Sequence, residues 1–174
     1  MRTTKKVTIS AMLTALGATL MIVGAVFEML DLSVCAIASL AVVFAYIELG
    51  SPYTWLIWLC TSLATALMFP GSIIWAEYLF VFGIYPIIKG YFEKLPRWAW
   101  IPVKLVYINA IIWALIFLVD AFFGTPLLDA DTPFLRACLY ILINVAFIAY
   151  DMFITVMVRL YFAKYREKFK KILK

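Results

Sequence analysis

One apolar segment near the C-terminus, RACLYILINVAFIAYDMF at residues 136–153, contains charged and amide side chains. Polar groups within hydrocarbon are costly unless they are paired, hydrated or used in function. Since each helical residue turns by about 100°, a helix here would gather the polar side chains on one face about 100° wide. That face carries Arg136, Tyr140, Asn144, Asp151 and Thr155. We expect these five residues, the polar stripe, to face a bundle interior or a hydrated cavity.

A lysine in the preceding apolar segment could pair with the acid of the polar stripe. Lys104 lies about 9 Å from the start of its expected helix, and Asp151 lies about 12 Å from Arg159, at about 1.5 Å per residue. Because these depths match, we predict an ion pair between Lys104 and Asp151, with helix packing as its expected role. Asn109 and Asn144 also lie at similar depth and could hydrogen-bond across their helices.

Two further charged residues lie near the opposite ends of their helices, where a small-molecule pocket would open. Glu77 lies just over a turn into its expected helix, and Arg136 lies about a turn into the polar stripe's helix. We predict that Glu77 and Arg136 pair or share one hydrated pocket. The candidate ligand contacts are therefore Glu77, Arg136, Tyr140 and Asn144; contacts that only fix the helix packing are the alternative.

The composition is that of an integral membrane protein. Hydrophobic residues make up 67% of the 174 residues and charged residues 14%, and the mean hydropathy is +1.03. A soluble domain is about half apolar and about a quarter charged. Apolar runs such as VCAIASLAVVFAYI exceed the roughly ten-residue alternating strands of a membrane barrel. We therefore expect one all-α domain over residues 1–174, a compact bundle of transmembrane helices.

Six spans are expected, at about residues 7–27, 32–47, 53–69, 73–88, 98–119 and 134–162. Basic residues occur in the start MRTTKK, in the segment KGYFEKLPR, which we assign to a loop together with its Lys89, and in the tail at about residues 160–174. Basic loops favour the cytoplasmic side, and six spans place all three clusters there. We expect both termini in the cytoplasm, with the amphipathic tail against an anionic lipid surface.

The sequence lacks the residue sets that metal binding, redox chemistry and catalysis require. The chain has no histidine, and its three cysteines lie in apolar runs without the spacing of metal ligands or a redox pair. We therefore expect no metal site and no cofactor. No nucleophile–base set or nucleotide-binding motif is present, so we expect no enzymatic activity and no transport powered by this chain alone. Nucleic acid is a poor partner for so short a basic tail.

The first expected helix, VTISAMLTALGATLMIVGAV, has small residues at a spacing of four. One row contains Ala11, Ala15 and Thr19, and a second row contains Ser10, Thr14 and Ala18. Small residues at this spacing let another helix approach closely. The partner is either a helix of the same bundle or a helix of another subunit, and the sequence leaves both open.

The chain resembles the substrate-binding S components of energy-coupling factor (ECF) transporters. The basic KK start, the segment AMLTALGA with its Ala11-x-x-x-Ala15 motif, and six short spans carry the resemblance. It implies a multi-pass protein of a bacterial plasma membrane that captures a vitamin-like micronutrient outside and topples to release it. It also implies that Ala11 and Ala15 dock onto a T subunit that works with two ATPases. The short FEMLD loop and the YIELGSPYTW junction depart from the family pattern. No segment of the sequence identifies a particular ligand.

A non-transport membrane scaffold is the alternative function. Morphogenesis proteins of the rod-shape MreD type have a similar size and a similar number of spans. For such a scaffold Ala11 and Ala15 would serve assembly, and the structure would need no ligand pocket. Substitution of Glu77 and Arg136 separates the two hypotheses, because only the transport protein would lose ligand binding.

Overall fold

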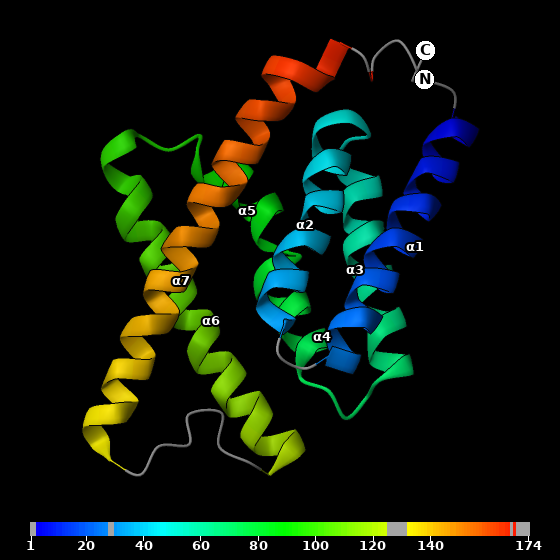
Figure 1. Cartoon of the computed structure of the whole chain (residues 1–174). Coiled ribbons are helices and arrows are strands. Elements are labelled where there is room, and N and C mark those ends of the chain that lie inside the picture. The colour runs from blue at the N-terminus through cyan, green and yellow to red at the C-terminus, as the bar shows by residue number, and fades with distance from the viewer. Residues whose placement is uncertain (1–2, 28–29, 125–131, 168, 170–174) are drawn as a thin grey trace.

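The computed structural model describes residues 3–27, 30–124, 132–167 and 169, and all of its regular elements are helical (Figure 1). Helices α1 (Thr3–Phe27), α2 (Asp31–Glu48) and α3 (Ser51–Met68) form one tightly packed group. A buried row on α1 faces this group and consists of Ser10, Gly17, Met21, Gly24 and Ala25. These bounds agree with the first three expected helices to within four residues.

The fourth expected helix is interrupted rather than continuous, which corrects the prediction of one helix over residues 73–88. It consists of α4 (Ile74–Glu77), the π-helical turn η1 (Tyr78–Phe82) and α5 (Tyr85–Phe92). Pro86 lies in the first turn of α5 and has no N–H to donate, so the carbonyl of Phe82 loses its helical partner. The hydroxyl of Tyr150 donates to that carbonyl instead, at 2.8 Å.

The last two long helices are α6 (Trp100–Phe123) and α7 (Pro133–Leu160), and they cross like the arms of an X beside the group formed by α1, α2 and α3 (Figure 1). A short 3-10 turn, η2 (Arg97–Ala99), precedes α6, and the π-helical turn η3 (Tyr161–Tyr165) continues α7. Gly124 ends α6 in the left-handed conformation with φ 63°. Thr132 caps α7, because its side chain accepts a hydrogen bond from the N–H of Leu135 at 3.3 Å.

Four of the described helical stretches are long and apolar enough to cross a membrane: Thr3–Phe27, Asp31–Glu48, Trp100–Phe122 and Pro133–Tyr165. Large apolar side chains on their outer faces are exposed, and Trp113 and Phe117 of α6 are 66% and 78% exposed. In water this much exposed apolar surface would drive association, whereas lipid solvates it. The structure is therefore compatible with an integral membrane protein.

The helices run in alternating directions between two ends of the molecule (Figure 1). The start of α1, the end of α5 and the end of α7 lie at one end. We call it the basic end, because Lys6 lies in α1, Lys94 shortly follows α5, and Lys164 lies in η3 beyond α7. The start of α2, α4 and the end of α6 lie at the other end, which we call the acidic end after Asp31, Glu77 and Asp120.

Candidate functional site

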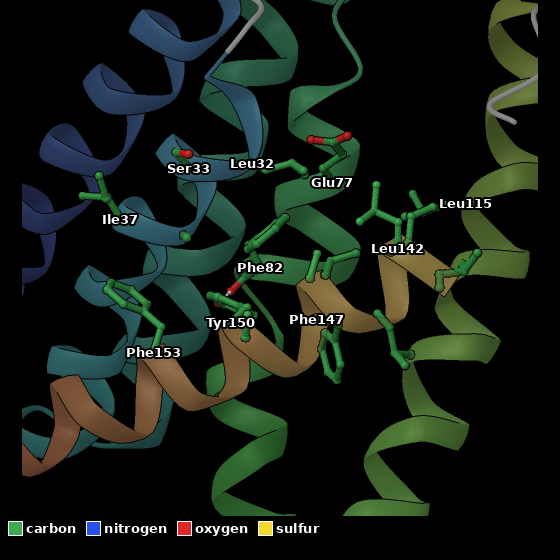
Figure 2. A pocket seen from close by; sticks show the side chains of 17 residues that line it. Leu32, Ser33, Ile37, Glu77, Phe82, Leu115, Leu142, Phe147, Tyr150 and Phe153 are labelled. Carbon is green, nitrogen blue, oxygen red and sulfur yellow. Dashed lines mark hydrogen bonds between the residues drawn. The ribbon is translucent and has the colours of Figure 1, made fainter. Parts of the chain in front are cut away.

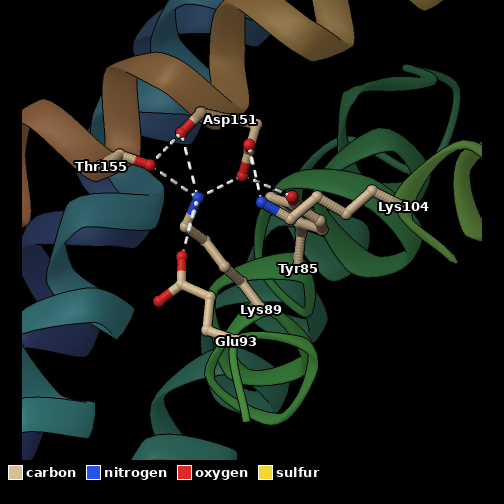
Figure 3. A network of polar contacts seen from close by, with 6 residues as sticks. All are labelled: Tyr85, Lys89, Glu93, Lys104, Asp151 and Thr155. Atoms are coloured by element: carbon tan, nitrogen blue, oxygen red, sulfur yellow. Dashed lines mark hydrogen bonds and ion pairs between the residues drawn. The ribbon is translucent and has the colours of Figure 1, made fainter. Parts of the chain in front are cut away.

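Asp151 on α7 is the centre of a buried ion cluster formed with α5 and α6 (Figure 3). The ammonium group of Lys104 donates to Oδ2 of Asp151 at 2.8 Å, which confirms the predicted ion pair. The hydroxyl of Tyr85 donates to Oδ1 at 2.6 Å, and the ammonium group of Lys89 also donates to Oδ1. Three donors thus converge on one carboxylate, which compensates the loss of its hydration.

Lys89 belongs to this cluster, which corrects its assignment to a loop at the membrane surface. Its ammonium group also donates to Oγ1 of Thr155 at 2.8 Å and lies 3.4 Å from Oε1 of Glu93, and the residue is only 5% exposed. The apolar run ends at residue 88, so hydropathy alone leaves Lys89 in the basic loop that follows. The spacing of four residues between Tyr85, Lys89 and Glu93 was the available signal, since it places all three on one helical face.

The two lysines and the two carboxylates of the ion cluster balance in formal charge. Lys89 and Lys104 contribute two positive charges, and Asp151 and Glu93 contribute two negative charges. Each lysine is hydrogen-bonded and mostly buried, so neither is available for an incoming anion. The cluster is suited to hold α5, α6 and α7 in register rather than to bind a ligand.

A second polar contact joins α6 and α7 closer to the acidic end. The side-chain amide of Asn109 donates to Oδ1 of Asn144 at 3.3 Å, and the hydroxyl of Tyr140 donates to Oδ1 of Asn109. The predicted contact between the two asparagines is therefore present. It also engages the polar atoms of Tyr140 and Asn144, two of the residues proposed above as ligand contacts.

An apolar cavity of about 850 Å³ lies between α2, η1, α6 and α7 (Figure 2). Its walls include Leu32 and Ile37 of α2, Val81 and Phe82 of η1, Ile108, Ile112 and Leu115 of α6, and Leu142, Ala146, Phe147 and Phe153 of α7. Such a volume is in the range of small-molecule sites, which are mostly apolar with a few polar groups. The cavity therefore has the size and the lining of a candidate ligand site.

Glu77 is the charged residue among the described side chains that line this cavity. It lies at one end of the cavity near Leu32, whereas the aromatic side chains of Phe82, Phe147 and Phe153 lie further in (Figure 2). Its atom Oε2 is fully buried and accepts no hydrogen bond from any residue that the structure describes. A desolvated carboxylate oxygen without a partner is costly, so a donor from a ligand would stabilise it.

The other three proposed ligand contacts do not line the cavity, and the predicted pairing of Glu77 with Arg136 is wrong for the described side chains. Arg136 is exposed near the start of α7. The reason is the rotation of α7: its polar stripe faces α5 and α6, and a neighbouring face with Leu142, Ala146 and Phe153 borders the cavity. A sequence pattern on one helix identifies its polar face, but it does not identify the helices that pack against that face.

The two small-residue rows of α1 have different environments. In the row of Ser10, Thr14 and Ala18, Ser10 is buried and the other two are half-buried. The adjacent Gly17 is also buried, and a Cβ atom added to it would lie 3.2 Å from Thr61 of α3. Ala11, Ala15 and Thr19 are exposed. The Ala11-x-x-x-Ala15 motif is therefore not used for packing among the described residues, and a helix of another molecule could reach it.

Comparisons with known proteins give no relative: no protein-family model, no curated protein and no solved structure matches this chain.

Proposed function

We propose that this chain is the membrane-embedded, substrate-binding subunit of an uptake system, of the ECF S-component kind. The observation that carries the proposal is the cavity of about 850 Å³ with Glu77 at one end. A scaffold needs no such cavity, whereas a binding subunit needs a space of this size that is closed toward one end of the molecule. In support, the ion cluster of Asp151 joins the three helices on the basic side of the cavity.

The proposed topology has six crossings of a bacterial plasma membrane, with both termini in the cytoplasm. The broken element from α4 to α5 would be the fourth crossing and α3 the third. Since basic residues favour the cytoplasmic side, the basic end would lie inside. Glu77 and its end of the cavity would then face the outside, where a nutrient is captured.

The proposed partner surface is the exposed row of Ala11 and Ala15 on α1. No nucleotide-binding motif is present in the sequence, so uptake by this chain would depend on a separate energising module. A T subunit with two ATPases would supply that energy, and its helices could approach α1 closely over the small side chains.

Affinity purification from mild detergent, followed by mass spectrometry, tests the partner part of the proposal. We expect a membrane subunit and ATPases to co-purify with the wild type and to be lost from Ala11→Leu/Ala15→Leu. The matched control is Ala110→Leu/Ala114→Leu, which enlarges two exposed alanines four residues apart on α6. Recovery of cell-wall or division proteins instead, lost in the same α1 variant, would favour the scaffold.

Analysis of the small molecules that co-purify tests the cavity itself. Ala146 lines the cavity, and Ala146→Trp should reduce the amount of bound small molecule because the indole occupies the space. Ala137 is an exposed alanine on the same helix that does not line the cavity, so Ala137→Trp is the control. Equal small-molecule content in wild type and Ala146→Trp would argue against a ligand cavity here.

A further inference from the structure

We infer that the cavity takes a hydrophobic organic cation, with a protonated amine donating to Glu77 and an apolar body between α2, η1, α6 and α7. The inference rests on the proposed function and specifies the class of its ligand. It follows from three features of the described residues: an unsatisfied acid at one end, an apolar wall around the rest, and the engagement of the nearby lysines elsewhere.

Glu77 provides the recognition group. Glu77 lines the cavity. Its Oε2 has no hydrogen-bond donor among the described residues, and none of their ion pairs includes Glu77. Because Oε2 is itself shielded, a ligand in the cavity reaches it through a rotation of the carboxylate. An ammonium group supplies both a positive charge and N–H donors, and charge-assisted hydrogen bonds are about twice as strong as neutral ones. A carboxylate ligand would add a second negative charge beside Glu77 and would be repelled.

The described lining around Glu77 adds no positive charge. Asp31 is the first residue of α2 and directly precedes Leu32, which lines the same end of the cavity. Lys89 of α5 and Lys104 of α6 are mostly buried, and both donate to Asp151 instead. No described lysine or arginine lines the cavity. The electrostatic preference at this site is therefore for a cation.

The rest of the wall selects an apolar or aromatic ligand body. The hydroxyl of Tyr150 is occupied, because it donates to Phe82 at 2.8 Å and contacts Oγ of Ser39 at 2.9 Å. Its ring therefore contributes apolar surface to the cavity, and it packs edge-on against Phe82 with 4.7 Å between the ring centroids. Apart from Glu77 and the hydroxyl of Ser33, the lining offers a ligand little to hydrogen-bond. A ligand rich in hydroxyl groups would therefore lose much of its hydration without compensation.

Three probes of matched shape test the inference on the full chain in lipid nanodiscs. They share a naphthalene ring: the cation 2-(1-naphthyl)ethylammonium, the neutral 2-(1-naphthyl)ethanol and the anion 3-(1-naphthyl)propionate. Equilibrium dialysis against empty nanodiscs corrects for partition into lipid. We expect the cation to bind about ten-fold more tightly than the alcohol, and the anion to bind more weakly than both.

Variants assign the preference to one carboxylate. Glu77→Gln keeps the shape of the side chain and removes its charge, so it should bring the affinities for cation and alcohol to within about two-fold. Asp120→Asn removes an exposed carboxylate at the acidic end of α6 and should leave the ten-fold preference unchanged. Ala146→Trp should weaken the binding of both probes.

The outcomes distinguish the presence of a ligand cavity from its preference for cations. If cation and alcohol bind equally and Ala146→Trp weakens both, the cavity binds small molecules and the cation inference is overturned. Tighter binding of the anion, or an unchanged preference in Glu77→Gln, overturns the cation inference as well. If no probe binds above empty nanodiscs, or if Ala146→Trp has no effect, the ligand cavity of the proposed function fails and the inference fails with it.

Discussion

At the scale of single residues, the carboxylate of Asp151 joins the members of the ion cluster. It accepts hydrogen bonds from Tyr85, Lys89 and Lys104, which come from two other helices. Removing one member of a buried ion pair costs about 3–5 kcal/mol, because the partner stays buried without compensation. Substitutions of Asp151 and of its hydrogen-bond donors should therefore differ in how much they destabilise the protein.

We predict that Asp151→Ala is the most destabilising single change in the ion cluster. It leaves two mostly buried lysines without their shared carboxylate, so its cost should be about 3–5 kcal/mol in the free energy of unfolding. Lys104→Met should cost less, because Lys89 and Tyr85 still satisfy Asp151. Unfolding in mild detergent, followed by circular dichroism, measures the order.

The combined variant Lys104→Met/Asp151→Ala supplies the control for this prediction. Since the two residues share a direct contact of 2.8 Å, their effects should not add, and the double variant should be more stable than the sum of the single changes predicts. Additive costs would mean that the contact between Lys104 and Asp151 contributes nothing to stability.

At the scale of elements, the interruption between α4 and α5 decides how the ion cluster and the cavity are built. Pro86 removes one helical hydrogen bond, and the freed carbonyl of Phe82 accepts from Tyr150 of α7. Gly83 lies within the interruption, where a Cβ atom would lie 2.5 Å from Cδ1 of Trp58 and 2.9 Å from the carbonyl oxygen of Tyr78. The interruption therefore needs both a residue without N–H and a residue without a side chain.

We expect Gly83→Ala to destabilise the protein by about 1–3 kcal/mol, because the added methyl group overlaps a backbone oxygen that cannot move aside. Gly71→Ala is the matched control, since a Cβ atom at Gly71 has no neighbour within 4 Å. The difference between the two variants in the midpoint of thermal unfolding measures the effect. Equal midpoints would show that the backbone at Gly83 has room to shift.

The polar contact between α6 and α7 permits a second test at this scale. Asn109→Leu alone leaves Asn144 and Tyr140 without their partner and should cost about 1 kcal/mol. Asn109→Leu/Asn144→Leu removes both amides, so it should restore part of that stability. A double variant that is less stable than either single variant would show that leucines cannot pack at this crossing.

At the scale of the whole molecule, the number of membrane crossings is the main prediction. If only the four long apolar stretches crossed the membrane, the two termini would still lie on the same side, as they do with six crossings. The two topologies differ only in whether α3 and the α4–α5 element also cross. The turn between α3 and α4 distinguishes the two topologies. It lies outside the cell for six crossings and on the cytoplasmic side for four.

We predict that Gly71→Cys, in a chain whose three natural cysteines are replaced by serine, reacts with a membrane-impermeant maleimide in intact cells. Gly71 is exposed and has space for a side chain. Thr132→Cys should react in the same way, and Lys94→Cys should react only after the cells are permeabilised. Protection of Gly71→Cys in intact cells, with both controls as expected, would contradict six crossings.

The sequence alone determined the all-helical class, the approximate ends of most helices and the pair of Lys104 with Asp151. These follow from hydropathy and from depth along regular helices, both of which are local properties. It also determined that four of the five residues of the polar stripe turn inward, since Tyr140, Asn144, Asp151 and Thr155 all make polar contacts with other helices.

Only the tertiary structure decided which helix each face meets. The rotation and crossing of α7 directed the polar stripe toward α5 and α6, left Arg136 exposed, and gave the cavity an apolar wall with Glu77 at its end. It likewise buried Lys89, which its position near a helix end did not suggest. Helix periodicity fixes angles within one helix, whereas the angles between helices depend on side-chain packing across the whole bundle.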